Sequence, residues 1–153
     1  MKKVAAALAL VLLLPLAALA DEIPELGNTG LQAMIDKNKG KVVMINFFAT
    51  WCPPCRVELP ELVKLRDAFP KDKFTLIGLA LDETRDPVGP FIKLVGINYP
   101  VYMANSTITD AYNINSVPFT VFINQQGQVD QAVAGIVNQE ELRQAVQDLI
   151  NKK

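Results

Sequence analysis

The stretch KVVMINFFATWCPPC at residues 41–55 decides the expected fold. Its first nine residues form a nearly continuous apolar run rich in branched and aromatic side chains, which is typical of a central strand covered on both faces. Cys52 and Cys55 follow directly, and behind them apolar residues recur at helical spacing. The two cysteines are therefore expected where a buried strand ends and a helix begins.

The rest of the chain predicts an alternation of strands and helices. After an irregular lead-in at 21–28, we expect helices over 29–38, 87–95, 107–112 and 140–150, a buried strand over 74–81, a short edge strand over 99–103, and a hairpin of 118–124 with 128–134. The first half implies parallel strands with right-handed crossovers, and the hairpin adds antiparallel pairing. The expected fold class is α/β, with a mixed central sheet and flanking helices.

The first twenty residues have the layout of a secretory signal. Lys2 and Lys3 precede an apolar run, and Ala18-Leu19-Ala20 has the small-x-small pattern of a cleavage site. We expect residues 1–20 to be a signal peptide and 21–153 to be one domain; an uncleaved membrane anchor is the alternative. The formal net charge of the 153-residue chain is −1, and no basic patch indicates nucleic-acid binding.

The chain has two cysteines, spaced C-x-x-C, and no histidine. A structural disulfide gains more by closing a long loop, so this short spacing favours a bond that is repeatedly made and broken. At the start of a helix, unpaired N–H groups and the macrodipole stabilise a Cys52 thiolate, and Arg56 adds a positive charge. Cys52 would form the mixed disulfide with a partner, and the more buried Cys55 would resolve it.

Other uses of two cysteines fit less well. A zinc site needs about four ligands, and a Cys/His hydrolase needs a histidine. An inert disulfide and a non-enzymatic metallochaperone that holds Cu(I) through Cys52 and Cys55 stay open. A peroxidase of the peroxiredoxin type would require Pro at 45 and Thr at 49, where the chain has Ile45 and Ala49. No cofactor or resident metal is expected.

A series of motifs resembles the TlpA/ResA/CcmG group of extracytoplasmic thioredoxin-like proteins. The motifs are NFFATWCPPCRVELP at 46–60, GINYP at 96–100 and VPFTVFIN at 117–124, and the resemblance covers roughly residues 25–150. It implies a thioredoxin-like fold with a TlpA-type central insertion around 86–102. It also implies a cis peptide bond before Pro118, which would place the backbone of Val117 against a substrate strand.

The resemblance further assigns residues around the cysteines. Trp51 is expected to pack beside the disulfide, to shield Cys55 and to contact substrate. Asn46 stands where thioredoxin has a buried aspartate. Glu83 matches the acidic residue beside the disulfide of ResA-like proteins, so we hypothesise a partly buried carboxyl that exchanges a proton with Cys55. The alternative is that Glu83 is a solvated loop carboxylate.

The function that the resemblance implies is reduction of disulfides in exported proteins, in the periplasm or another extracytoplasmic space. In the family this often keeps apocytochrome c cysteines reduced during cytochrome c maturation. A membrane thiol transporter of the CcdA/DsbD type would supply the electrons, and the protein would act as a monomer. A disulfide oxidase or isomerase on the same fold is the nearest alternative.

Overall fold

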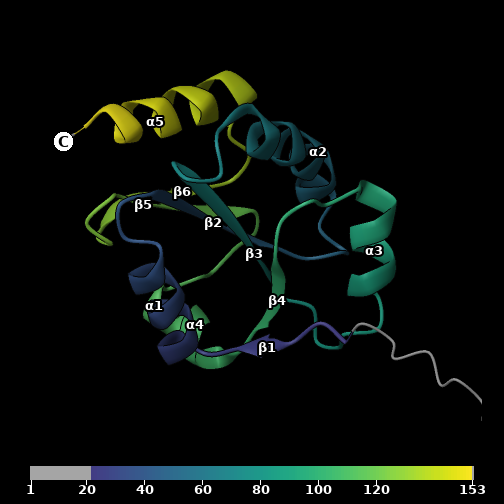
Figure 1. Ribbon diagram of the computed structural model, residues 1–153. Helices are drawn as coiled ribbons and strands as arrows, with labels where there is room; N and C mark the ends of the chain where they lie inside the picture. Colours follow the sequence, from purple (N-terminus) through teal and green to yellow (C-terminus); the bar gives the residue numbers. More distant parts are fainter. Residues whose placement is uncertain (1–21, 153) are drawn as a thin grey trace, which may run out of the picture.

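The computed structural model describes residues 22–152, so the expected signal peptide lies outside the described residues. These residues form a six-stranded mixed sheet with helices on both faces (Figure 1). In chain order the elements are β1 (Glu25–Leu26), α1 (Asn28–Lys37), β2 (Val42–Phe48), α2 (Pro53–Ala68), β3 (Phe74–Ala80), α3 (Val88–Val95), β4 (Val101–Ala104), α4 (Ser106–Ala111), β5 (Phe119–Ile123), β6 (Val129–Ala134) and α5 (Gln139–Asn151).

The apolar run at 41–49 forms the central strand, as predicted. Every residue of β2 is buried, and the strand pairs in parallel with β3 and antiparallel with β5. Asn46 is the polar residue within this apolar strand, and its cross-strand neighbours are Gly78 and Thr120. The sheet therefore carries one buried amide at its centre, below the cysteines.

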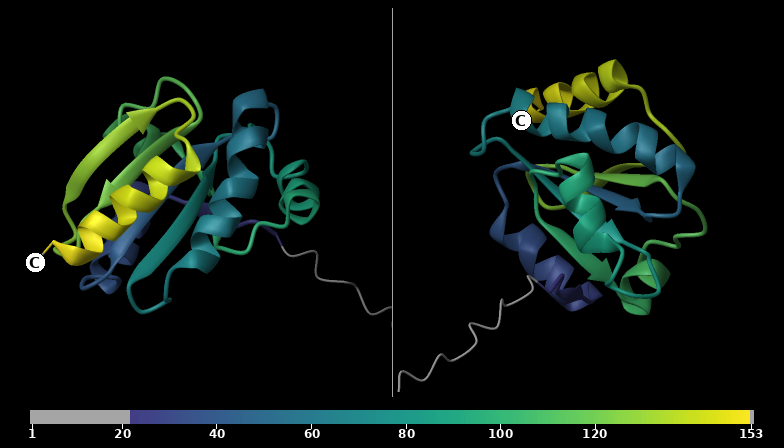
Figure 2. Two further views of the ribbon diagram at one scale, coloured as in Figure 1. Left: turned by 90° about the horizontal axis from the view of Figure 1, so that it is seen from above. Right: turned by 90° about the vertical axis from the view of Figure 1, so that its right-hand side faces the viewer.

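The two faces of the sheet bear separate hydrophobic clusters. Helices α2, α3 and α5 cover one face, while α1 and α4 cover the other. Along β2, Met44 and Phe48 lie in the first cluster, and Ile45 and Phe47 lie in the second. Figure 2 shows α2 and α5 running alongside each other over the same face. The helix that begins at the cysteines is thus packed against the sheet and a second helix.

The order of strands is β1-β4-β3-β2-β5-β6, and it corrects two expectations. Strand β4 is not an edge strand, because β1 pairs with it in parallel through Glu25↔Met103 and Leu26↔Ala104. The lead-in is therefore not wholly irregular, although a strand of two residues is too short to produce a sequence pattern. Residues 86–102, where a central insertion is expected, form α3 and lead into β4.

None of the helices within residues 22–152 is long and apolar enough to span a membrane.

Candidate active site

Cys52 and Cys55 are joined by a disulfide at the point where the chain passes from β2 into α2. Cys52 is the N-cap of α2, and its Sγ accepts a hydrogen bond of 3.2 Å from the N–H of Cys55. Cys52 is 2% exposed and Cys55 is fully buried. An otherwise unpaired N–H at the positive end of the helix thus points at the sulfur that would become a thiolate.

The peptide bond between Val117 and Pro118 is cis, as expected from the resemblance. It lies opposite the disulfide, where the carbonyl oxygen of Val117 is 3.6 Å from Cys52 Sγ. The loop before β5 therefore forms one wall beside the first cysteine. A role of Val117 and Pro118 in holding substrate stays a prediction.

Trp51 projects from the surface at the cysteine turn, and its expected roles in shielding Cys55 and contacting substrate stay predictions. Its exposed fraction is 65%, whereas Cys55 lies within the hydrophobic cluster under α2. The indole lines a pocket of about 380 Å³ between the cysteine turn and the loop before Pro118. The other lining residues are Leu81, Ile114, Asn115, Ser116 and Val117. The pocket therefore adjoins the two residues that flank Cys52 in space, Trp51 in the chain and Val117 across the site.

The expected partial burial of Glu83 is wrong: its side chain is exposed, and the neighbouring Asp82 is the buried carboxylate. Asp82 turns inward because Thr50 offers it donors in place of water. The N–H of Thr50 donates to Oδ1 and Oδ2 at 3.2 and 3.1 Å, and its hydroxyl donates to Oδ1 at 2.5 Å. Asp82 is therefore bonded to the turn that leads into Cys52.

A second buried carboxyl, Glu58, was missed by the sequence analysis. It is 2% exposed and lies on α2 three residues after Cys55, which places both on the same face of the helix. Its Oε2 accepts from Asn46 Nδ2 at 3.0 Å and its Oε1 accepts from the Val137 N–H at 3.2 Å. Burial raises the pKa of Glu58, and the hydrogen bonds from Val137 and Asn46 oppose that rise in part.

Two buried polar atoms next to this carboxyl have no partner within the described part of the chain. They are Oδ1 of Asn46 and the hydroxyl of Tyr99. Asn46 uses its Nδ2 for both Glu58 and Thr120 Oγ1, the latter at 3.2 Å. Burial, and secondarily the charge of Glu58, raises the pKa of Tyr99, so its hydroxyl keeps its proton. Glu58 is therefore the group of this cluster whose protonated form is favoured by burial.

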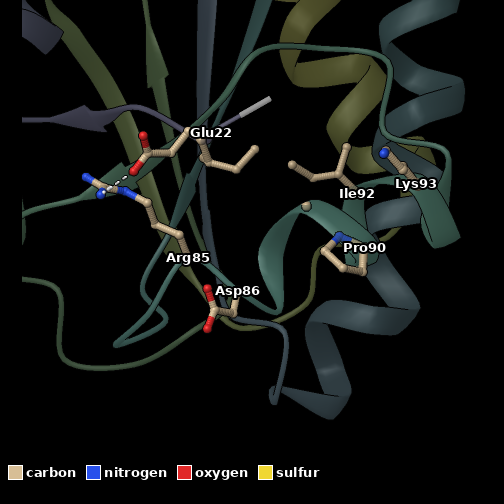
Figure 3. Close-up of a pocket in the computed structure, with 8 residues that line it drawn as sticks. Glu22, Arg85, Asp86, Pro90, Ile92 and Lys93 are labelled. Atoms are coloured by element: carbon tan, nitrogen blue, oxygen red, sulfur yellow. Dashed lines mark hydrogen bonds and ion pairs between the residues drawn. The ribbon is translucent and has the colours of Figure 1, made fainter. Parts of the chain in front are cut away.

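A pocket of about 590 Å³ lies away from the disulfide, beside α3 (Figure 3). Pro90, Ile92 and Lys93 of α3 line one side, and the ion pair of Arg85 with Glu22, 2.9 Å long, lines the other. No cysteine contributes to this lining. Within residues 22–152, no group of three or more Asp, Glu, Cys or His side chains is placed to hold a metal ion.

The sequence model of the AhpC/TSA family matches residues 18–132. The chain belongs to the AhpC/TSA family. It is 32% identical to thiol-disulfide oxidoreductase ResA of Oceanobacillus iheyensis over 112 residues, which make up 72% of this chain and 58% of that protein. It is 28% identical to sporulation thiol-disulfide oxidoreductase A of Bacillus subtilis, covering 70% of this chain and 67% of that one. The chain thus spans less than two thirds of the length of that ResA.

Solved structures of thiol-disulfide exchange proteins have a similar fold. A thiol:disulfide interchange protein of the thioredoxin family from Chlorobium tepidum superposes with a TM-score of 0.71 at 33% identity, over 75% of this chain and 83% of that one. StoA from Bacillus subtilis superposes with a TM-score of 0.61 at 28% identity, over 69% and 82%. The thioredoxin-like fold and the resemblance to ResA-type proteins are confirmed.

Proposed function

We propose that this AhpC/TSA family member is a thiol-disulfide oxidoreductase that reduces disulfides of exported proteins through Cys52 and Cys55. The observation that carries the proposal is the position of the disulfide at the N-terminus of α2, where the Cys55 N–H donates to Cys52 Sγ. That N–H stabilises a thiolate on the sulfur that also lies beside the carbonyl of Val117, a residue that lines the pocket next to the cysteine turn. A relative's name as thiol-disulfide oxidoreductase supports the same reaction.

In the reduced protein, the Cys52 thiolate attacks one sulfur of the substrate disulfide. The substrate S–S bond breaks, one substrate thiolate leaves, and a mixed disulfide forms. Cys55 then loses its proton and attacks Cys52 Sγ, which releases the second substrate thiolate and closes the Cys52–Cys55 disulfide seen here. Two electrons pass to the substrate, whose two sulfurs take up protons.

Glu58 replaces Glu83 as the candidate acceptor of the Cys55 proton. It is buried on the same helical face as Cys55, and burial raises the pKa of Glu58, which favours uptake of a proton by this carboxyl. Asn46, which cannot take a proton, holds the carboxyl in place. Glu83 is exposed to solvent, so it lacks the burial that the proton-acceptor hypothesis required.

The physiological setting follows from the sequence. Export through residues 1–20 would place the domain outside the cytoplasm, where disulfides form and persist. There the family resemblance favours apocytochrome c as a substrate and a membrane thiol transporter of the CcdA/DsbD type as the electron donor. Because a reduced Cys52–Cys55 pair is consumed in each cycle, such a donor is required for turnover.

The proposal is tested by trapping the mixed disulfide. Reduced Cys55→Ser protein is mixed with an unfolded disulfide-bonded protein and analysed on a non-reducing gel. We expect a covalent adduct that dithiothreitol releases, because the resolving thiol is missing. The matched variant Cys52→Ser should form far less adduct. Equal adduct from both variants, or none from either, contradicts the proposal.

The direction of exchange is tested by the reduction potential of the Cys52–Cys55 pair in thiol/disulfide buffers. A value near or below roughly −230 mV places the protein with thioredoxin-like reductants. A value near roughly −120 mV makes it an oxidant and rejects the reductase assignment, although the exchange chemistry stands.

A further inference from the structure

The hydrogen-bond donors of Thr50, two residues before Cys52, are bound by an acidic side chain. Its N–H and hydroxyl both donate to the carboxylate of Asp82, which follows β3 and is 8% exposed. An ionised carboxylate only accepts hydrogen bonds, and all three of these bonds are donated to it. Asp82 therefore places a carboxylate side chain, shielded from solvent, against the turn that carries the first cysteine.

A basic side chain, Arg56, binds the carbonyl oxygen of the same residue. Arg56 Nε donates to the carbonyl oxygen of Thr50 at 2.8 Å, and the guanidinium lies over the Phe91 ring, 5.4 Å from its centroid. Phe91 in turn stacks on Phe48 at the end of β2, with ring centroids 6.2 Å apart. Arg56 is exposed but held in place, and none of the ion pairs found within residues 22–152 joins it to Asp82.

The opposite wall of the site contributes no charge. Residues 112–118, which end at the cis peptide bond beside Cys52, have the uncharged sequence YNINSVP. The other ionisable groups on this side are Glu58, buried beneath the disulfide, and the exposed Glu83. Two charged side chains of opposite sign therefore bond to Thr50, and their fields act on Cys52 in addition to that of the Cys55 N–H at the start of α2.

We propose that Asp82 is a positioning residue for disulfide exchange: it fixes the turn at Thr50, and its charge, opposed by that of Arg56, sets how stable the Cys52 thiolate is. This inference rests on the proposed function. The anion disfavours the thiolate and so favours the disulfide form, which makes the protein a stronger reductant. The cation acts in the other direction, with a smaller effect because solvent screens it.

The test is the reduction potential of single variants, with a thiolate titration by ultraviolet absorbance. Asp82→Asn keeps the shape and one acceptor oxygen but removes the charge. We expect its equilibrium with glutathione to shift about three- to tenfold toward the reduced protein, tenfold being about 30 mV for a two-electron couple. The midpoint of the Cys52 thiolate titration should fall to lower pH. Arg56→Gln should move both quantities in the opposite direction by a smaller factor.

Two matched variants separate charge from structure. Glu83→Gln removes the same charge one residue away but touches nothing at Thr50, so its shift should be smaller than that of Asp82→Asn. Thr50→Val removes the hydroxyl donor and leaves both charges, so it should lower stability more than it moves the potential. Unfolding midpoints of all variants show whether each one is folded.

The opposite signs make the proposal falsifiable even where a variant is destabilised. A merely structural role would move the potential of Asp82→Asn and Arg56→Gln in the same direction, or leave both unchanged, and either result overturns it. So does a larger shift in Glu83→Gln than in Asp82→Asn. If the Cys55→Ser trap fails while the potentials shift as expected, the proposed function is wrong and the tuning of the disulfide stands.

Discussion

At the scale of single residues, the amide of Asn46 can form a hydrogen bond with the buried carboxyl of Glu58 in either protonation state of that carboxyl. Asn46 presents its Nδ2 to ionised Glu58, while its own Oδ1 has no partner in the described chain. Rotation of the amide by about half a turn would present Oδ1 instead, which can accept a hydrogen bond from the O–H of protonated Glu58. The Asn46 side chain can therefore stay paired while Glu58 gains or loses its charge.

Replacing Glu58 with Gln should stabilise the protein at neutral pH. Because burial raises the pKa of Glu58 above its ordinary value of 4.5, the folded state binds this proton more tightly than the unfolded state. Stability from this group is full below 4.5 and is lost as pH rises through the folded pKa. The gain in free energy of unfolding from Glu58→Gln should therefore grow above pH 4.5, by about 1.4 kcal/mol for each pH unit, until the pKa of the folded state is passed.

Urea unfolding of oxidised wild type and Glu58→Gln between pH 4 and pH 8 measures this difference. Glu61→Gln on the same helix, which removes a half-buried carboxylate paired with Lys64 at 2.8 Å and outside the Asn46 cluster, is the control for loss of a charge alone. A gain that stays constant over this range would mean that Glu58 does not titrate in the folded protein. The same variant should slow closure of the mixed disulfide if Glu58 accepts the Cys55 proton.

At the scale of elements, the packing of β3 against its neighbours is tighter than the strand pattern alone shows. A Cβ added at Gly78 would lie 3.1 Å from Val101, 3.3 Å from Phe48 and 3.3 Å from Tyr99. At Gly89 in α3, an added Cβ would meet nothing within 4 Å. One glycine therefore allows close approach of buried side chains, and the other only weakens a helix.

We expect Gly78→Ala to lower the free energy of unfolding by about 1–3 kcal/mol, because buried neighbours must move. Gly89→Ala should raise it by up to about 1 kcal/mol through helix propensity. Urea denaturation of the two variants and wild type, in the same redox state, measures both effects. If both variants changed the free energy of unfolding in the same direction, the close contacts around Gly78 would not determine the effect of its replacement.

How far the sequence predicts these elements depends on their length and periodicity. Helices α1, α3 and α5 and the buried strands β2, β3 and β5 have clear patterns and were predicted close to their observed bounds, whereas for α2 the spacing predicted a helix without its bounds. β1, with two residues, has no pattern of its own and is defined by its partner β4. Without β1, the sequence offered no sign that β4 is an inner strand.

The same limit explains the site. Cys52, Cys55 and Pro118 were found because they stand in a motif. Glu83 was selected by its match to ResA-like proteins. The preceding strand is buried on both faces, so no alternation showed that Asp82 and not Glu83 lies inward. Glu58 could have been found: it follows Cys55 by three residues and precedes Leu59 and Leu62, so helical spacing alone directs it inward. Its partners Asn46 and Val137 are distant in sequence and required the structure.

At the scale of the whole molecule, one sheet is shared by both hydrophobic clusters. Because β2, β3 and β5 contribute side chains to each face, neither layer can lose its packing without exposing the other side of the same strands. We therefore expect the oxidised domain to unfold as a single cooperative unit.

Coincident urea transitions by far-ultraviolet and tyrosine near-ultraviolet circular dichroism would confirm this. The slope should be about 1–3 kcal/mol per M urea, as for other small domains. Trp51 fluorescence is a poor probe of unfolding because the indole is already 65% exposed, but it lies next to the disulfide and suits redox titration. An earlier transition in one probe would show that one layer unfolds separately.

The hydrogen bond from the Val137 N–H to Glu58 connects the helix of the cysteines to a segment far away in the sequence. Val137 lies immediately before Asn138, the N-cap of α5, whose side chain accepts from the Glu141 N–H. When Glu58 takes the proton of Cys55, the acceptor of Val137 loses its negative charge and the bond weakens. If Glu58 takes that proton, as proposed above, the residue before the N-cap of α5 would be held less tightly in one step of the cycle than in the others.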